Sequence, residues 1–439
     1  MTILSHTART SLRDTVRGAV LFPGDPGFDQ VHRPWNHAIS QSVRAVVEAD
    51  DAAEVAALVR YAGSHGLSVA TQPSGHGATG RADGAILLRT SRLDGIEVDP
   101  VARTARIGAG VRSGALQRAV APYGLTALPG SSPGVSVTGA ALGGGLSWFG
   151  RCFGWIADSI LSAEVVTADG VAQRVDSRSD PELLWALRGG GGDLAIVTEL
   201  ELRLHPAPAV FGGRQLWSAA HAQDVARVFR ALAEEAPPEL TLWLELLSFP
   251  GGEPMIAIDS TLLGDESEAR RLMAATESLP APLTDTRAVL GVDELGQITA
   301  EPLDPGPGKS RAELLTRLDD DALAALLDRP IAPLMTVQIR HLGAALAGPS
   351  DSPHGPLEEP YALYLFGVPS TEEASEAIGR RQSELAAALP VSGRKPLTFL
   401  APGESLPDAL PEASMQRLRR LKQERDQRGT VRGNVGILG

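Results

Sequence analysis

Only one cysteine occurs in the 439-residue chain, Cys152, so an intrachain disulfide and a metal cluster held by thiolates are both excluded. No other metal site is predicted. No run of about 18 apolar residues is present, which argues against a membrane-spanning helix. The opening stretch, Met1 to Val20, has no apolar core followed by a cleavage site, so we expect no signal peptide and a cytoplasmic protein. The net charge of −13 disfavours nucleic acid and anionic membranes as partners.

What remains has the composition of an ordinary globular protein, with 43% hydrophobic and 21% charged residues. The length allows two or three domains, because a single hydrophobic core stops growing at about 250–300 residues. The 47 glycines and 32 prolines are spread through the chain and indicate many turns. The sequence contains no internal repeat, and it does not fix the oligomeric state.

The first half of the chain reads as two subdomains. Residues 40–100 alternate strands with a helix that Asp50 and Asp51 cap, which is typical of a small α/β unit. Residues 101–207 are rich in strands, and the prolines of 205–208 mark a boundary. The stretch before residue 40 shows little periodicity, so no regular element is predicted there. The expected elements are strands at 42–48, 67–71, 85–88, 96–99, 104–107, 163–167, 171–175 and 199–204, and helices at 52–65, 114–121 and 181–187.

The second half follows another order, in which strands are paired in sequence and helices lie between the pairs. This order favours an antiparallel sheet covered on one face by helices. We expect a substrate domain at 208–400 and a C-terminal segment, 401–439, that ends in a helix whose arginines form a solvated face. The expected strands are 241–247, 255–262, 335–341 and 361–367, and the expected helices are 224–235, 266–276, 320–327, 372–389 and 415–425.

Four segments rich in small residues stand out in the first half. His76 lies between two glycines in the first of them, and Pro129 to Gly145 forms the second. Phe153–Asp158 and Arg188–Thr198 are the third and fourth. Glycine lets backbone N–H groups approach a ligand closely, so such segments suit a dinucleotide with two phosphates. For any one segment alone, a tight turn is the competing interpretation. No P-loop is present, and the glycines at 108, 110 and 114 have the wrong spacing for a Rossmann fingerprint.

The order and spacing of these segments resemble the FAD-linked oxidases of the vanillyl-alcohol-oxidase superfamily, in the berberine-bridge-enzyme-like branch. The resemblance is strong over residues 40–206 and moderate over 410–439. Between them it is limited to the order of helices and strands. It implies an α+β fold, in which a two-part FAD-binding domain of the PCMH type is joined to the substrate domain. It also implies a flavoprotein oxidoreductase of secondary metabolism.

By this resemblance, His76 corresponds to the histidine that bonds the flavin covalently through its 8α-methyl group. Some members carry a second link through a cysteine, but this chain has Ser132 at that position, so a single attachment is expected. The cofactor-binding residues that the resemblance implies are Pro73, Ser74, Gly75, His76, Gly77, Pro129, Gly130, Ser131, Gly134, Val135, Gly139, Ala140, Gly143, Gly145, Ile196, Val197 and Asn434.

Two departures from the family pattern concern the chemistry. The family's Asn-Phe-Gly after the four glycines is Asp193-Leu194-Ala195 here, and the aromatic stretch that often supplies a catalytic tyrosine is missing around 400–414. Catalytic groups must then come from elsewhere. Alternation on the strands of the expected sheet offers polar side chains on one face. The catalytic candidates are Tyr364, Glu245, Arg340 and Gln338, each with a structural role as the alternative.

The leading hypothesis is an oxidase in which FAD takes a hydride from a small organic molecule and O₂ is the final electron acceptor. The alternative is a flavin-containing protein that catalyses a redox-neutral cyclisation or uses FAD structurally. A nicotinamide-dependent dehydrogenase is disfavoured because no fingerprint is present. The implied partners are therefore FAD, a small-molecule substrate and O₂.

Overall fold

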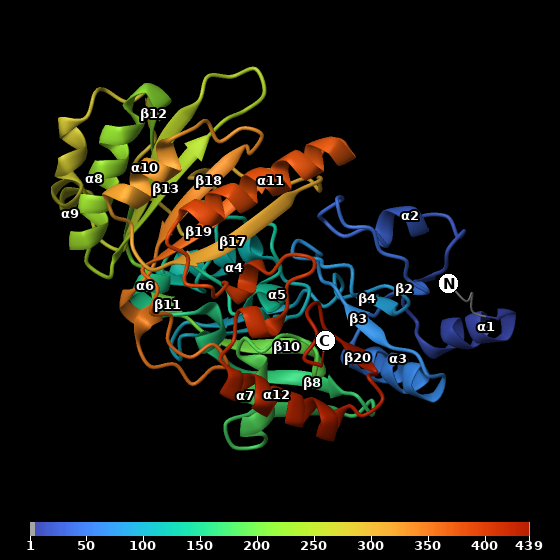
Figure 1. Ribbon diagram of the computed structural model, residues 1–439. Coiled ribbons are helices and arrows are strands. Elements are labelled where there is room, and N and C mark those ends of the chain that lie inside the picture. Colours follow the sequence, from blue (N-terminus) through green and yellow to red (C-terminus); the bar gives the residue numbers. More distant parts are fainter. Residues whose placement is uncertain (1–4, 439) are drawn as a thin grey trace.

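The computed structural model describes residues 5–438 (Figure 1). Within this range the strands form two five-stranded sheets, an eight-stranded sheet and a two-stranded pair. The mixed helix and sheet architecture confirms the predicted α+β class. No helix in the described range is both long and apolar enough to cross a membrane.

The first sheet is built mostly from parallel strands. Its order is β1 (Val20–Leu21), β2 (Ala45–Glu48), β4 (Ile86–Arg89), β3 (Val69–Thr71) and β20 (Val431–Arg432). Helix α3 (Ala52–Ser64) connects β2 to β3, and the side chain of Asp51 caps it by accepting a hydrogen bond from the amide of Glu54. The terminal strand β20 pairs with β3 in parallel, so the two ends of the chain meet in one sheet.

The prediction of no regular element before residue 40 is wrong for the described part of that stretch; residues 1–4 lie outside it. Helix α1 (His6–Thr15) packs on α3 through Leu12, which is fully buried, and α2 (Phe28–Val31) follows β1. Helix α1 is polar on all but one narrow stripe, so its sequence shows little of the apolar periodicity on which the prediction depended.

The second sheet is antiparallel and lies against the first. Its order is β5 (Ile96–Asp99), β6 (Thr104–Gly108), β10 (Ala195–Arg203), β8 (Ile160–Thr167) and β9 (Ala172–Asp176). The predicted hairpin at Asp169-Gly170 joins β8 to β9. The helices of this region are α4 (Ser113–Val120), α5 (Val137–Leu142), α6 (Gly150–Phe153) and α7 (Pro181–Leu187), and β7 (Leu125–Thr126) pairs with β11 (His205–Pro206).

The third sheet contains every strand from residue 210 to residue 367, as the element order predicted. Its strands are, in spatial order, β15 (Thr284–Asp285), β12 (Val210–Ser218), β14 (Met255–Leu262), β13 (Leu240–Leu247), β18 (Thr336–His341), β19 (Tyr361–Gly367) and β17 (Lys309–Leu315), with β16 (Ala288–Leu290) paired to β12. Its helices are α8 (Ala222–Glu235), α9 (Glu266–Leu272), α10 (Asp320–Leu327) and α11 (Glu372–Ala388).

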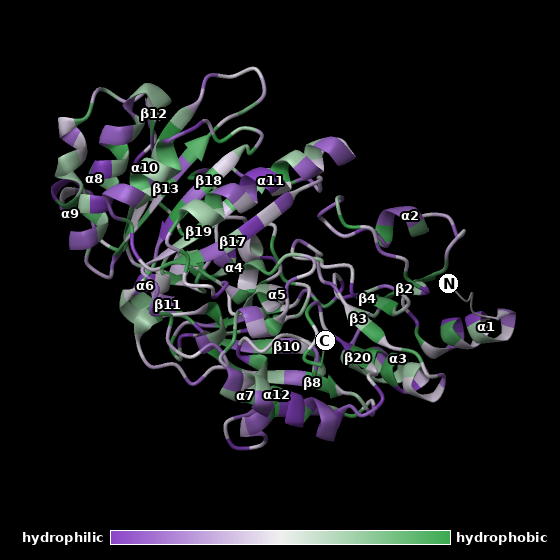
Figure 2. Cartoon of the chain, in the orientation of Figure 1, coloured by the Kyte–Doolittle hydropathy of each residue, from purple (hydrophilic) through white to green (hydrophobic). Residues whose placement is uncertain are grey.

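The two faces of this sheet have different neighbours. Leu242 and Leu244 pack with Phe229 of α8 in the core beneath the helices, where the apolar colouring of the strands is visible in Figure 2. Trp243 points the opposite way and belongs to the core of the first half of the chain. The face opposite the helices therefore turns toward the glycine-rich segments.

Strands β12 and β17 were not predicted. Strand β12 contains Gly212 and Gly213, which read as a turn, and Gly213 has a φ of +145°. A side chain at Gly212 would collide with the backbone of Ser260 on β14, so the glycine is required by close pairing and not by a turn. Strand β17 alternates Lys309, Arg311 and Glu313 with smaller or apolar residues, which is typical of a half-buried strand, but it follows directly on the Pro/Gly-rich stretch 302–308, where no strand was expected.

The C-terminal segment returns to the first half of the chain, as Figure 1 shows for α12 (Glu412–Arg425) beside α7. Arg417 lies over the ring of Trp185 and pairs with Glu182, and Arg425 pairs with Asp180. The expectation that the arginines of this helix form a solvated face is therefore wrong for these two. They attach the helix to α7.

Asp193 fixes the last residues of the chain. Its carboxylate is buried and accepts hydrogen bonds from the amides of Gly433, at 2.7 Å, and Ile437, at 3.1 Å. The ammonium of Lys422, also buried, lies 3.6 Å from the same carboxylate and 2.8 Å from Asp426. An asparagine at this position would have only one oxygen to accept from both N–H groups. The two oxygens of Asp193 are therefore suited to holding residues 433–437 in place.

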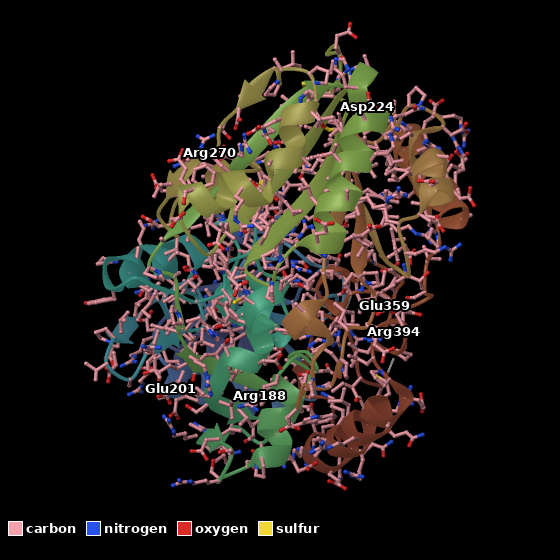
Figure 3. The ribbon with its side chains drawn as sticks, turned by 90° about the vertical axis from the view of Figure 1, so that its left-hand side faces the viewer. Arg188, Glu201, Asp224, Arg270, Glu359 and Arg394 are labelled. Carbon is pink, nitrogen blue, oxygen red and sulfur yellow. The ribbon has the colours of Figure 1, made fainter. Side chains whose placement is uncertain are left out.

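A second ion pair links the third sheet to the segment that leads out of it. Glu359 and Arg394 lie side by side, with 3.5 Å between their charged groups (Figure 3). Glu359 is buried next to the start of β19, so the pair positions the chain just before the C-terminal segment.

Candidate functional site

The imidazole of His76 is held on three sides. It stacks on the indole of Trp35, with 4.3 Å between ring centroids, and its Nδ1 lies 2.9 Å from Oγ of Ser74. The φ of +78° at Gly75 turns the chain so that its backbone lies against Pro34. The remaining ring nitrogen, Nε2, is buried and has no hydrogen-bond partner among the described residues.

The first and second glycine-rich segments meet at this imidazole. A Cβ atom at Gly134 would lie 3.8 Å from Nε2 of His76. Arg112 bridges the two segments, since it donates hydrogen bonds to the carbonyl oxygens of Gly134, at 2.8 Å, and Pro73, at 3.4 Å. Burial, and the positive charge of Arg112, lower the pKa of His76 to about 4. The imidazole is therefore neutral at physiological pH and can act as a nucleophile.

Asn434 connects the closing segment to the same loop. Its side chain donates to the carbonyl oxygen of Gly77, at 2.6 Å, and accepts from the amide of Thr79, at 3.1 Å. This contact spans more than 350 residues of sequence. It supports the prediction that Asn434 belongs to the site, although through the loop that carries His76.

The other predicted cofactor residues lie before, within and just after α5, and two lie on β10. The carbonyl oxygen of Pro129 accepts from Ser147 and from the amide of Trp148, and the carbonyl oxygen of Val135 accepts from Ser113. The side chains of Ile196 and Val197 on β10 lie in hydrophobic cores, so only their backbone can face a ligand. The rest of this predicted set is Gly130, Ser131, Gly139, Ala140, Gly143 and Gly145.

Several glycines of the later runs are explained by packing. The imidazole of His354, from the loop before β19, stacks on Trp155 and fills the space where side chains at Gly144 and Gly189 would lie. A Cβ atom at Gly145 would come within 2.7 Å of Ile156. These positions need glycine because other groups approach their backbones closely, which is the competing interpretation of such runs.

The four catalytic candidates come together on the face of the third sheet that lies opposite its helices. Gln338 donates to Glu245 at 2.5 Å, and its carbonyl oxygen accepts from Nε and Nη2 of Arg340 at 3.0 and 2.7 Å. The guanidinium of Arg340 lies 5.5 Å from the ring centroid of Tyr364. Strand register explains the cluster, because Glu245 is opposite Gln338 and Gln338 is opposite Tyr364 on neighbouring strands.

Two members of this cluster were missed in the sequence. Arg214 on β12 donates to both oxygens of Asp259 on β14, at 2.6 and 2.7 Å, and to Glu245 at 2.7 Å. Arg214 belongs to the unpredicted strand, and Asp259 is a single acid in an apolar strand whose partner the sequence does not reveal. We call Arg214, Asp259, Glu245, Gln338 and Arg340 the roof network.

The carboxylates of the roof network are almost completely buried. Burial, and the charge of Asp259 nearby, raise the pKa of Glu245 to about 8, and burial also raises the pKa of Asp259. Arg214 opposes both shifts, and its own pKa is raised by the two acids. The two carboxyl groups thus favour holding one proton between them at neutral pH.

Three contacts place the roof network above the glycine-rich segments. Trp243 stacks on Trp148, which follows the glycine run 143–145, at 3.8 Å between centroids. Arg340 lies 4.9 Å from the ring of Phe399, and the neighbouring Thr398 is next to Gly143.

The third contact is made by the proline-rich loop 300–308. Its backbone hydrogen-bonds with Trp35 and Asn36 beside His76, and Glu301 at its other end acts electrostatically on Arg340. The loop therefore connects the His76 region to the roof network.

The residues around His76 fit the flavin that the sequence resemblance implies. An unpartnered buried nitrogen faces Gly134, where any larger residue would reduce the space next to the ring. FAD carries a methyl-substituted ring edge that such a nitrogen can attack, and glycine-rich backbone along 129–145 suits its extended form. The residues that would hold it are His76, Ser74 and the backbone of the first two segments.

The buried histidines predict a loss of stability in mild acid. Burial lowers the pKa to about 4 for His76 and His205 and to about 3 for His341 and His354. The folded state therefore binds fewer protons than the unfolded state below the ordinary histidine pKa. We expect the free energy of unfolding to fall as the pH drops from about 6.5 toward about 4, by up to ~1.4 kcal/mol per pH unit for each histidine.

Urea unfolding at several pH values and constant ionic strength measures this slope. Exposed carboxylates contribute little above about pH 5, while the raised pKa of Glu245 stabilises the folded state as the pH falls, so the net fall between about pH 6.5 and about pH 5 is the effect of the four histidines less this opposing contribution. A free energy of unfolding that stays constant over that interval would contradict the prediction.

Known proteins share both the sequence pattern and the fold. A family model described as an FAD binding domain matches residues 43–176. (R)-6-hydroxynicotine oxidase from Paenarthrobacter nicotinovorans is 32% identical over 294 residues, which are 65% of this chain. The chain spans only 64% of the length of that curated relative.

Two solved structures resemble this chain over nearly its whole length. The structure of 6-hydroxy-D-nicotine oxidase from Arthrobacter nicotinovorans has a TM-score of 0.85 at 25% identity and covers 96% of this chain and 98% of its own. The BBE-like 1 protein of Physcomitrella patens has a TM-score of 0.86 at 20% identity, with 98% of each chain covered, which is a likeness of fold. The chain therefore contains an FAD binding domain over residues 43–176, and its fold is similar to that of FAD-linked oxidases over nearly its whole length.

Proposed function

We propose that this chain is an oxidase that holds FAD through one covalent bond to His76 and oxidises a small organic molecule, with O₂ as the electron acceptor. Bound FAD supplies the redox chemistry, since it accepts a hydride and passes two electrons to O₂. The relative that is named an oxidase of 6-hydroxynicotine supports oxidation of a small organic substrate. Substrate would bind between the His76 region and the roof network.

One observation carries the proposal, the free Nε2 of His76. The nitrogen is buried and unpartnered, while Nδ1 is engaged by Ser74, so the ring presents one defined nucleophile. Because the pKa is lowered to about 4, the ring is neutral at physiological pH, and in the tautomer in which Nδ1–H donates to Ser74 the lone pair lies on Nε2. Stacking on Trp35 fixes the plane of the ring. These features suit attachment of a flavin.

The roof network supplies the groups that face the substrate. Both oxygens of Glu245 are engaged, by Gln338 and by Arg214, so Glu245 acts by orienting its neighbours. Tyr364 presents the hydroxyl of the cluster and packs against Phe399 with 5.1 Å between ring centroids. We propose that Arg340 and Tyr364 contact the substrate, and that Gln338 and Glu245 hold Arg340 in place.

The test uses purified yellow protein and a panel of small alcohols, amines and phenols. A substrate should bleach the flavin absorbance without O₂, and admission of O₂ should restore it with consumption of O₂. Tyr364→Phe should lower kcat by at least about 100-fold, because a positioned acid–base group contributes about 10²–10⁴-fold to proton transfer. Turnover without any change in the flavin spectrum would instead favour a redox-neutral cyclisation and would refute the oxidase.

A further inference from the structure

Arg340 is a buried cation without an anionic partner. Arg340 is 6% exposed, and among residues 5–438 the hydrogen bonds of its guanidinium go only to Oε1 of Gln338. Within residues 5–438, no carboxylate lies within 4.0 Å of the guanidinium, and Nη1 has no hydrogen-bond partner. A buried charge is costly unless it is paired, so a lone guanidinium in this place indicates a partner that the chain itself does not supply.

The rest of the roof network does not neutralise Arg340. Arg214 makes the short contacts of this network with Asp259 and Glu245, so the charge of these two carboxyl groups is offset at Arg214, and neither of them forms an ion pair with Arg340. Gln338 stands between this group and Arg340. Because the amide nitrogen of Gln338 donates to Glu245, its oxygen must point to Arg340, which fixes the guanidinium without cancelling its charge.

Aromatic rings surround the unpaired end of this guanidinium. It lies 3.9 Å from the ring centroid of Trp243, 4.9 Å from that of Phe399 and 5.5 Å from that of Tyr364. The remaining charged neighbour is Glu301, half-buried on loop 300–308, which influences the pKa of Arg340 but forms no ion pair with it. The surroundings are therefore apolar and flat, with one free cationic donor group.

We infer that Arg340 binds an anionic oxygen, a carboxylate or a phenolate, on a planar aromatic substrate. The two faces of Trp243 are covered by Trp148 and by Arg340, so a planar substrate ring would contact Phe399 and the edge of Trp243, while Nη1 donates to the anionic oxygen in a charge-assisted hydrogen bond. Glu301 would weaken such binding by repulsion. This inference rests on the proposed function, because it assigns the substrate class of the same site.

The experiment measures binding of benzoate, benzamide and benzylammonium to the purified full-length protein by calorimetry. These probes share one ring and differ in charge, so the ring contacts cancel. Benzoate should bind at least about tenfold more tightly than benzamide, as a charge-assisted hydrogen bond predicts, and benzylammonium should bind least. Arg340→Met should remove the preference for benzoate, and Arg340→Lys should retain part of it.

Glu301→Gln is the matched variant with the opposite expected sign. Glu301 makes no ion pair or hydrogen bond among the described residues, so its replacement should leave the fold intact and tighten benzoate about two- to tenfold without affecting benzamide. Equal affinity for benzoate and benzamide in the unmodified protein would overturn the inference. So would a benzoate affinity that Glu301→Gln leaves unchanged, even if Arg340→Met fails to fold.

The presence or absence of bound flavin shows whether a negative result concerns this inference or the proposed function. A yellow protein that does not distinguish the probes keeps the oxidase proposal and loses the substrate class. A colourless protein that prefers benzoate through Arg340 loses the oxidase proposal and keeps the anion site.

Discussion

His76→Ala should abolish covalent flavin attachment completely. The unmodified protein, precipitated with acid, should keep its yellow colour and show the added mass of one FAD, whereas the variant should release all flavin into the supernatant. The reason is that Nε2 of His76 is unpartnered and lies next to Gly134, where the first two glycine-rich segments meet. Denaturing mass spectrometry and the visible spectrum measure both outcomes.

His205→Ala is the matched control. Its imidazole is also half-buried, also lies 2.9 Å from a serine hydroxyl, that of Ser159, and is also in contact with an aromatic ring, that of Phe153. Its pKa is lowered to about 4 as well. The variant should lose stability and keep its covalent flavin. Flavin that stays attached in His76→Ala, or that is lost equally from both variants, would contradict the assignment.

Ser74→Ala should slow attachment and not prevent it. The hydroxyl of Ser74 holds Nδ1 of His76, so its loss frees the ring to rotate while the nucleophilic nitrogen remains. The time course of flavin incorporation into the apoprotein distinguishes this positioning effect from the loss of the nucleophile.

Local patterns were sufficient to predict most of the fold. Strand β14, helix α10 and strand β19 have the predicted bounds, because each is a run with a clear period and a clear stop. The glycine-rich motifs identified His76 in the same way, since their order along the chain is a local property. Helix α1 and strand β12 were not predicted, because α1 has a weak apolar periodicity and β12 contains two adjacent glycines.

The site depends on contacts that no local pattern reveals. Trp35 stacks on His76 from 41 positions away, and His354 fills the space above Gly144 and Gly189 from the other half of the chain. Alternation did place Glu245, Gln338 and Arg340 on one face. It could not show that Arg214 lies across β14 from them, because register between strands depends on pairing that forms only in the folded sheet.

Arg214→Met should be among the most destabilising single substitutions in the protein. It would leave Asp259, 0% exposed, and Glu245, 2% exposed, without the cation that contacts both. Breaking a buried ion pair by removing one partner costs about 3–5 kcal/mol, and we expect the free energy of unfolding to fall by that amount. Urea denaturation followed by circular dichroism measures it.

The exposed pair of Arg270 with Glu266 on α9 provides the control, and Figure 3 shows Arg270 on the outer side of the third sheet. Arg270→Met should cost less than about 1 kcal/mol, because water screens that pair. Replacing Arg214 by Met together with Asp259 by Leu should cost less than the sum of the two single changes, since no charge is then stranded at position 259.

The pH dependence of the stability deficit shows whether uncompensated carboxylates cause the destabilisation of Arg214→Met. In Arg214→Met the two acids can avoid ionisation only by binding protons, so the stability deficit relative to the unmodified protein should shrink as the pH falls from about 8 to about 5. A deficit caused by lost packing would not change with pH. A constant deficit, or one below about 1 kcal/mol at neutral pH, would show that Arg214 does not compensate these carboxylates, and the offset of their charge at Arg214 would have to be abandoned as well.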